Sequence, residues 1–173
     1  EVSTRFEIAA GIRKISDIDG PALLYEKIKN YPNWKVAAGV YGTRKLLAIA
    51  LETSEDEMMA HYKTLEKKFI PPRDVDSGPV QEVVITGDDI DLYQLPIPVH
   101  SEFDIGAYIT IAVQFGKDPE TGVGNLGIHR MLVMGKNRLS LWAPPDHHIG
   151  RFIVRAEDHG KGLPVATIIG ADP

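Results

Sequence analysis

The side chains best suited to chemistry gather between residues 125 and 148 of this 173-residue chain. The segment Asn125–Arg130 (NLGIHR) supplies an amide oxygen, an imidazole and a guanidinium, and His147 and His148 add two more imidazoles. Amide oxygens and imidazoles ligate metal ions, whereas a guanidinium pairs with a carboxylate or a phosphate. These residues therefore predict a site for a phosphate, a metal ion, a carboxylate or a combination of them.

The two histidines precede a segment of helical periodicity, in which Ile149, Phe152, Ile153 and Ala156 form one apolar stripe. We expect Asp146 to cap this helix. The unpaired backbone N–H groups and the positive end of the helix dipole make such a terminus a ready anion site. A capped helix with two solvated histidines is the structural alternative, and the sequence leaves both open.

Asn125 and Arg130 also have structural explanations. Asn125 follows a glycine-rich turn, where the backbone can approach a ligand closely, but an amide there can equally stabilise its own turn. Arg130 falls inside a predicted apolar strand, residues 126–134, where a buried guanidinium needs a structural carboxylate or a bound ligand. Residues five apart on a regular strand face opposite ways. A shared site therefore requires Asn125 in the preceding loop, or a bulge. Thr110 in the preceding strand is a candidate polar contact.

The composition excludes several classes of function. A net charge of −5 argues against a general binder of nucleic acid or anionic membranes. The chain has no cysteine, so any metal must be held by imidazole, carboxylate, amide or carbonyl groups. No apolar run approaches the roughly 20 residues of a membrane span, and nothing resembles a signal peptide. These features indicate a cytoplasmic protein.

The pattern of elements predicts an α+β chain with two lobes. Residues 1–77 are expected to form an α/β lobe, with helices over 21–30, 43–51 and 54–69 and a strand over 34–40. Residues 78–173 are expected to form a mainly antiparallel β lobe, whose strands cover 80–86, 108–115, 126–134, 138–142 and 163–169. The helix after Asp146 is its crossover connection, and the last strand is predicted to be buried on both faces.

Several short motifs stand in order along the second lobe. They are Leu95–Ile97, His100–Glu102, Lys117–Gly122, Asn125–Arg130, Gly135–Asn137, Leu163–Val165 and Gly170–Pro173. Together they resemble the UbiD family of reversible decarboxylases, over roughly residues 80–173. The resemblance implies a lobe similar to flavin-reductase split barrels, which binds prenylated flavin mononucleotide (prenylated FMN). It also implies Mn²⁺ (or Mg²⁺) bridging the flavin phosphate to the protein, with K⁺ nearby.

The resemblance assigns roles to individual residues. Asn125 and His148 match metal ligands of the family, and Arg130 matches the catalytic arginine that orients the substrate carboxylate. The cofactor contacts that it implies are Thr110, Ile128, His129, Arg130, His147 and His148.

The implied activity is reversible, non-oxidative decarboxylation of an aromatic or α,β-unsaturated carboxylic acid by a homo-oligomer. The chain starts without methionine and stops at Pro173, so we expect it to be part of a longer polypeptide, with the lobe incomplete. A glutamate metal ligand and the acidic proton donor of the family are expected beyond Pro173, and the 173 residues alone are predicted to be inactive. The alternatives are a non-catalytic flavin- or phosphate-binding β-barrel domain and a flavin reductase.

Overall fold

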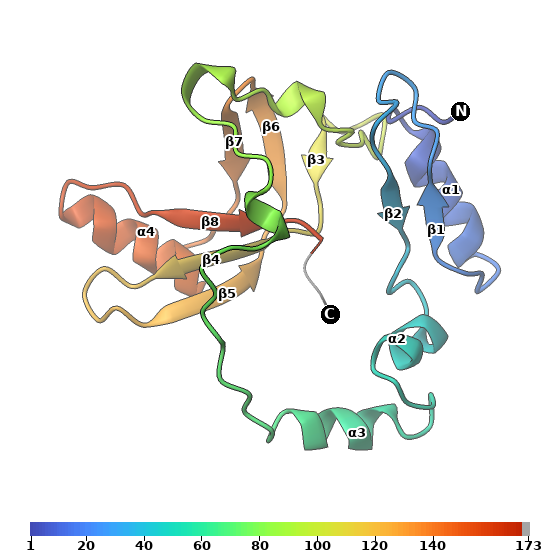
Figure 1. Ribbon diagram of the computed structural model, residues 1–173, viewed down its shortest axis with the longest axis horizontal. Coiled ribbons are helices and arrows are strands. Elements are labelled where there is room, and N and C mark those ends of the chain that lie inside the picture. Colours follow the sequence, from blue (N-terminus) through green and yellow to red (C-terminus); the bar gives the residue numbers. More distant parts are fainter. Residues whose placement is uncertain (171–173) are drawn as a thin grey trace. The chain divides into compact units, whose positions relative to one another are not determined.

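The computed structural model describes residues 1–170, which divide into two compact units, residues 1–96 and residues 97 onward (Figure 1). Helices and strands are mixed along the chain, as the sequence predicts. Ala171–Pro173, the end of the last motif, lie outside the described residues. The predicted boundary between residues 77 and 78 falls in a segment without regular secondary structure and stays a prediction. No helix in residues 1–170 is both long and apolar enough to cross a membrane.

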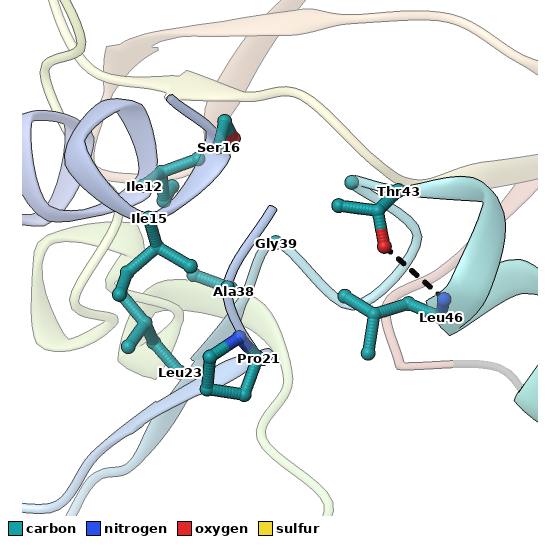
Figure 2. A pocket seen from close by; sticks show the side chains of 11 residues that line it. Ile12, Ile15, Ser16, Pro21, Leu23, Ala38, Gly39, Thr43 and Leu46 are labelled. Carbon is teal, nitrogen blue, oxygen red and sulfur yellow. Dashed lines mark hydrogen bonds between the residues drawn. The ribbon is translucent and has the colours of Figure 1, made fainter. Parts of the chain in front are cut away.

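The first unit is built on a helix packed against a two-stranded sheet. It contains α1 (Glu7–Ser16), β1 (Leu23–Tyr25) and β2 (Val36–Ala38), and the two strands pair antiparallel. The Tyr25 hydroxyl donates a hydrogen bond to the Ile8 carbonyl oxygen, at 3.3 Å, and thereby ties β1 to the helix. A cavity of about 10 Å³ lies beside this packing. Figure 2 shows the side chains that line it, most of which are apolar. Such a volume holds about one water molecule.

Two short helices follow, and a side-chain hydrogen bond caps the first of them. In α2 (Arg44–Ala50) the Thr43 hydroxyl accepts a hydrogen bond from the Leu46 N–H, drawn as a dashed line in Figure 2. This confirms the predicted cap. Before α3 (Met58–Leu65), the Ser54 hydroxyl accepts from the Glu57 N–H. The Glu57 carboxylate accepts from the Ser54 hydroxyl instead of its backbone, so the predicted capping box is only half formed.

Two predictions for this unit are wrong. The segment 21–30 is not a helix, because Leu23 and Tyr25 are half-buried while Leu24 between them is exposed, a strand pattern that a short apolar run conceals. The segment 80–86 contains no strand, since its valines find no partner strand among residues 1–170; Val80 is 90% exposed. It begins with the 3₁₀ turn η1 (Pro79–Gln81), and η2 (Gly87–Asp89) and η3 (Leu92–Gln94) follow.

The second unit holds two three-stranded sheets in which every pairing is antiparallel, as predicted (Figure 1). One sheet has the order β3 (Tyr108–Ile109), β6 (Met131–Gly135), β7 (Arg138–Leu141). The other has the order β5 (Gly124–Ile128), β4 (Val113–Lys117), β8 (Val165–Ile168). Ile109 at the end of β3, Ala112 just before β4 and Met131 at the start of β6 form a buried cluster. Residues 97–170 show no closed barrel.

Two long strands expected from the sequence are each split between the sheets. The segment 108–115 breaks after Ile109 to give β3 and β4, and the segment 126–134 breaks at His129–Arg130 to give β5 and β6. Each pair passes from one sheet to the other at its break, as strands do at the corner of packed sheets. A continuous apolar run does not reveal such a corner.

Helix α4 (His148–Asp158) connects β7 to β8, and Gly160 follows its C-cap residue, His159, as a terminating glycine, as expected. Gly160 has a φ of 67°, and its N–H and that of Lys161 donate to the carbonyls of Glu157 and Ala156, which is the pattern of a glycine C-cap. The prediction that the final strand is buried on both faces is wrong. Among residues 97–170, β8 pairs on one side only, with β4, and its Ile168 is 43% exposed.

Candidate functional site

The side chains of Asn125 and His148 meet although they lie 23 positions apart in the sequence. Asn125 belongs to β5, and His148 is the first residue of α4. His148 Nδ1 lies 2.9 Å from Asn125 Oδ1. With that oxygen as the acceptor, Nδ1 donates, and Nε2 of a neutral imidazole keeps its lone pair. The pair presents an amide oxygen and an imidazole side by side, and both are metal-ligand types.

This pair lies in an open pocket of about 320 Å³, lined by residues 125–129 and 146–148. The volume falls at the lower end of the range for small-molecule sites. β5 is the outer strand of its sheet and has a paired neighbour on one side only among residues 97–170. Its outward backbone groups are therefore open to a ligand. The pocket thus offers backbone and side-chain partners to a polar molecule.

The start of α4 adds a positive field to this pocket. His147 is the N-cap residue, and no side chain caps the helix. The first-turn N–H groups therefore have no intrahelical or side-chain acceptor, an arrangement that favours an anion. The predicted Asp146 cap is wrong, because only the Asp146 carbonyl oxygen is engaged, by Arg151 Nη2 at 3.0 Å. The His147 ring instead lies with its centroid 5.7 Å from that of His129.

A buried glutamine holds the point where the chain leaves β5. Gln114 in β4 is 1% exposed. Its Oε1 accepts from the His129 N–H at 2.8 Å, and its Nε2 donates to the His129 carbonyl at 3.2 Å. The side chain therefore replaces the strand partner that His129 lacks at the corner between β5 and β6. It fixes the backbone beside His129 and Arg130.

The surroundings of Arg130 differ from the prediction. Arg130 lies between two strands and is exposed, so the premise of a buried guanidinium inside a strand is wrong. Because the strand ends at Ile128, the alternation argument against a site shared with Asn125 no longer applies. The guanidinium lies 5.5 Å from the ring centroid of Tyr108 and has no carboxylate partner within residues 1–170. That leaves it able to bind an external anion.

The structure assembles some predicted site residues and not others. Asn125, Ile128, His129, His147 and His148 line one pocket. Thr110, just after β3, and Arg130 do not line it, and Thr110 is exposed. Over the described part of the chain, no three His, Asp or Glu side chains converge to hold a metal ion. An Asn–His pair would need at least one more ligand.

An ion pair joins α4 to the β4–β5 hairpin. Arg155 Nη1 pairs with Asp118 Oδ2, and Arg155 Nε lies 3.4 Å from Glu120 Oε2. The Asp118 side chain is 7% exposed. The hydrogen bond from the Glu120 N–H, at 3.0 Å, and the Arg155 charge lower the pKa of Asp118, and together they outweigh burial, which acts in the opposite direction.

Sequence reasoning missed Gln114, Asp118 and Arg155 as parts of the site's support. A usable signal existed for Gln114, the amide that interrupts the apolar run of residues 108–115. A polar side chain in such a run is buried only with partners. No comparable signal links Asp118 to Arg155, which lie 37 positions apart.

Comparison with known proteins identifies the family of this chain. The family model described as the 3-octaprenyl-4-hydroxybenzoate carboxy-lyase Rift-related domain (UbiD) matches residues 73–173, and that of the N-terminal domain matches residues 1–65. Anhydromevalonate phosphate decarboxylase of Methanothermobacter thermautotrophicus is 35% identical over the whole chain, which covers 39% of that relative. Phenolic acid decarboxylase of Bacillus subtilis is 31% identical, with the same coverage of each chain.

Solved structures extend the likeness to three dimensions. An evolved dimeric form of the UbiD-class enzyme HmfF from Pelotomaculum thermopropionicum, in complex with prenylated FMN, is 37% identical with a TM-score of 0.89. The likeness covers 99% of this chain and 40% of HmfF. The chain thus spans about two fifths of the length of these relatives. Matched over both lobes by family models and in structure by HmfF, the chain belongs to the UbiD family.

Proposed function

We propose that this chain is the cofactor-binding portion of a reversible, non-oxidative decarboxylase that uses prenylated FMN. The observation that carries the proposal is the contact between Asn125 and His148 in a pocket at the uncapped start of α4. That arrangement suits a phosphate bridged by a metal ion. The prenylated FMN complex of HmfF supports a flavin as the molecule that brings the phosphate. A split-barrel lobe completed by residues outside 97–170 is part of the proposal.

The residues present fit a metal-bridged phosphate in chemistry. Asn125 Oδ1 and a ring nitrogen of His148 would be two ligands of Mn²⁺ or Mg²⁺. Such ions favour oxygen, so we infer that phosphate oxygen and a carboxylate from elsewhere in the protein complete the set, with K⁺ nearby. The first-turn N–H groups of α4 and His147 would face the same phosphate. Ile128, His129 and Thr110 would contact the rest of the flavin.

We propose that Arg130 binds the carboxylate of the substrate. Its guanidinium is exposed and has no carboxylate partner among the described residues, so a bidentate pair with the substrate carboxylate costs no existing ion pair. Loss of CO₂ leaves carbanion character on the substrate, and a bound prenylated FMN would supply the electron sink that no side chain offers. The proposed substrate is an aromatic or α,β-unsaturated carboxylic acid. The names of the phenolic acid and anhydromevalonate phosphate decarboxylases support this class.

A non-catalytic flavin- or phosphate-binding domain is the second candidate. It is favoured by one observation, that Thr110 and Arg130 do not line the pocket that holds the Asn125–His148 pair. The residues assigned to the phosphate therefore share one pocket, whereas Arg130, which is assigned to the substrate, lies outside it. A flavin reductase is a further outcome that the experiment below distinguishes. A homo-oligomer and a cytoplasmic location stay predictions.

The decisive experiment replaces Arg130 by methionine in the complete protein. The protein is loaded with prenylated FMN and Mn²⁺, and flavin absorbance, metal content and CO₂ release from cinnamate- and benzoate-type acids are measured. We expect Arg130→Met to abolish CO₂ release while flavin and metal stay bound. The matched control is Arg138→Met, an exposed arginine in β7, which is expected to leave all three unchanged.

The other outcomes identify the alternatives. Flavin binding with no CO₂ release from any tested acid by the parent protein would favour a non-catalytic domain. Oxidation of a nicotinamide with reduction of the flavin would favour a reductase. Undiminished CO₂ release by Arg130→Met would refute the role assigned to Arg130.

A further inference from the structure

The ion pairs of Arg155 hold the far end of the helix that carries His148. Arg155 lies in the last turn of α4 and pairs with Asp118 and Glu120, both in the turn of the β4–β5 hairpin. Asp118 is fixed independently of Arg155, because its carboxylate accepts from the Glu120 N–H and its backbone N–H donates to the Val123 carbonyl at 2.9 Å. Arg155 therefore pairs with a carboxylate that cannot follow the helix if the helix moves.

The start of the helix meets the same hairpin at a second point. His148 and Arg155 are seven positions apart, which is about two helical turns and about 10 Å along the axis. Both side chains therefore project from one face of the helix. Ile149 packs over Gly116, the cross-strand partner of Asn125. A Cβ added to Gly116 would lie only 2.6 Å from Ile149 Cδ1. The side chain of Ile149 is therefore in close contact with β4 beside the Asn125–His148 contact.

The contact between His148 and Asn125 has little support of its own. His148 is exposed and Asn125 is half-buried, and a hydrogen bond between such side chains contributes little against competition from water. Its persistence depends on where α4 places the imidazole. Across residues 97–170, the ion pairs of Arg155 are the charged contacts that join α4 to the hairpin.

We propose that Arg155, paired with Asp118 and Glu120, is a positioning residue that holds His148 in ligand geometry with Asn125. The inference deepens the proposed function and rests on it for its metal readout. Asp118 is the fixed partner in these ion pairs. If the ion pairs were lost, the helix would tilt about the Gly116–Ile149 contact. None of these residues touches the ligand itself.

The test measures Mn²⁺ affinity of the complete protein in the presence of FMN, by titration with detection of free Mn²⁺ by electron paramagnetic resonance. We expect Arg155→Met to weaken Mn²⁺ binding about tenfold, the lower end of the effect of removing a residue that supports a metal ligand. Arg155→Lys, which keeps a cation, should recover most of the affinity. Arg138→Met, with the same change of side chain in β7, should leave the affinity unchanged.

A double-mutant cycle separates positioning from a general loss of stability. If Arg155 acts through His148, Arg155→Met should weaken Mn²⁺ binding no further once His148 is alanine. An equal tenfold loss in the His148→Ala background would overturn the proposal, as would an unchanged affinity in Arg155→Met alone.

A metal-free readout keeps the inference independent of the proposed function. In a crystal structure of the complete Arg155→Met protein without metal, we expect His148 Nδ1 to leave hydrogen-bonding distance of Asn125 Oδ1. Retention of the 2.9 Å contact would overturn the proposal even if the parent protein bound no Mn²⁺. Failure of the parent to bind Mn²⁺ and FMN would refute the proposed function instead.

Discussion

Replacement of Gln114 by leucine should destabilise the corner between the two sheets, because this one side chain satisfies both backbone groups of His129. An unpaired buried donor or acceptor costs about 1–3 kcal/mol, and Gln114→Leu leaves two of them. His129 is half-buried, so water can reach part of its backbone. Leucine also refills most of the space. We therefore expect the free energy of unfolding to fall by about 2–4 kcal/mol, a large part of the stability of an ordinary domain.

Two measurements check this value in the complete protein. Urea unfolding followed by circular dichroism gives the free energy of unfolding. An unchanged slope of this free energy against urea concentration would show that unfolding exposes the same surface in both proteins. Amide hydrogen exchange, read by mass spectrometry over the peptide that joins β5 to β6, tests whether the loss is local to His129. Gln81→Leu is the matched control, since Gln81 is exposed and should change stability by less than about 0.5 kcal/mol.

The reasoning predicts a functional consequence as well. His129 lines the pocket assigned to the flavin, and Arg130 follows it directly. Release of the His129 backbone should therefore weaken both flavin binding and substrate binding. A Gln114→Leu protein within about 0.5 kcal/mol of the parent, with unchanged exchange at the corner, would refute the role given to this glutamine.

Two further predictions test the helix that carries the histidines. Gly150→Ala should destabilise α4 by about 1–3 kcal/mol, because the added Cβ would collide with the Pro144 carbonyl oxygen. Gly162→Ala is the control, since a Cβ there meets open space. Equal melting temperatures for the two variants would contradict the close packing at Gly150. The Glu120 N–H, and after it Arg155, lower the pKa of Asp118 in the folded protein. Asp118 should therefore stabilise the fold at pH values above its unfolded-state pKa, and this stability should be lost as the pH falls through its folded-state pKa. Asp118→Asn should therefore reduce the fall of the urea midpoint with decreasing pH between about pH 5 and pH 2. A fall equal to that of the parent would count against a lowered pKa of Asp118.

The sequence by itself determined the features that depend on local chemistry. The Thr43 cap, the glycine that ends α4 at Gly160 and the antiparallel hairpins follow from short-range hydrogen bonding and turn preferences. The cluster of ligand-type residues was likewise visible as spacing, and the ordered motifs identified the family. Asn125 and His148 could be named as partners because the resemblance carried that information; their separation along the chain did not.

Only the tertiary structure decided what depends on where elements meet. Whether residues 21–30 form a helix or a strand was settled by pairing with β2, because a short apolar run suits both. The apolar runs of 108–115 and 126–134 gave no sign of the corner at which each passes between sheets. Because of that corner, Arg130 does not lie in a buried strand, and Gln114 forms hydrogen bonds with the backbone of the neighbouring His129. The Asp118–Arg155 pair joins residues whose mutual distance is set by packing of α4 on the hairpin, and no local pattern encodes that distance.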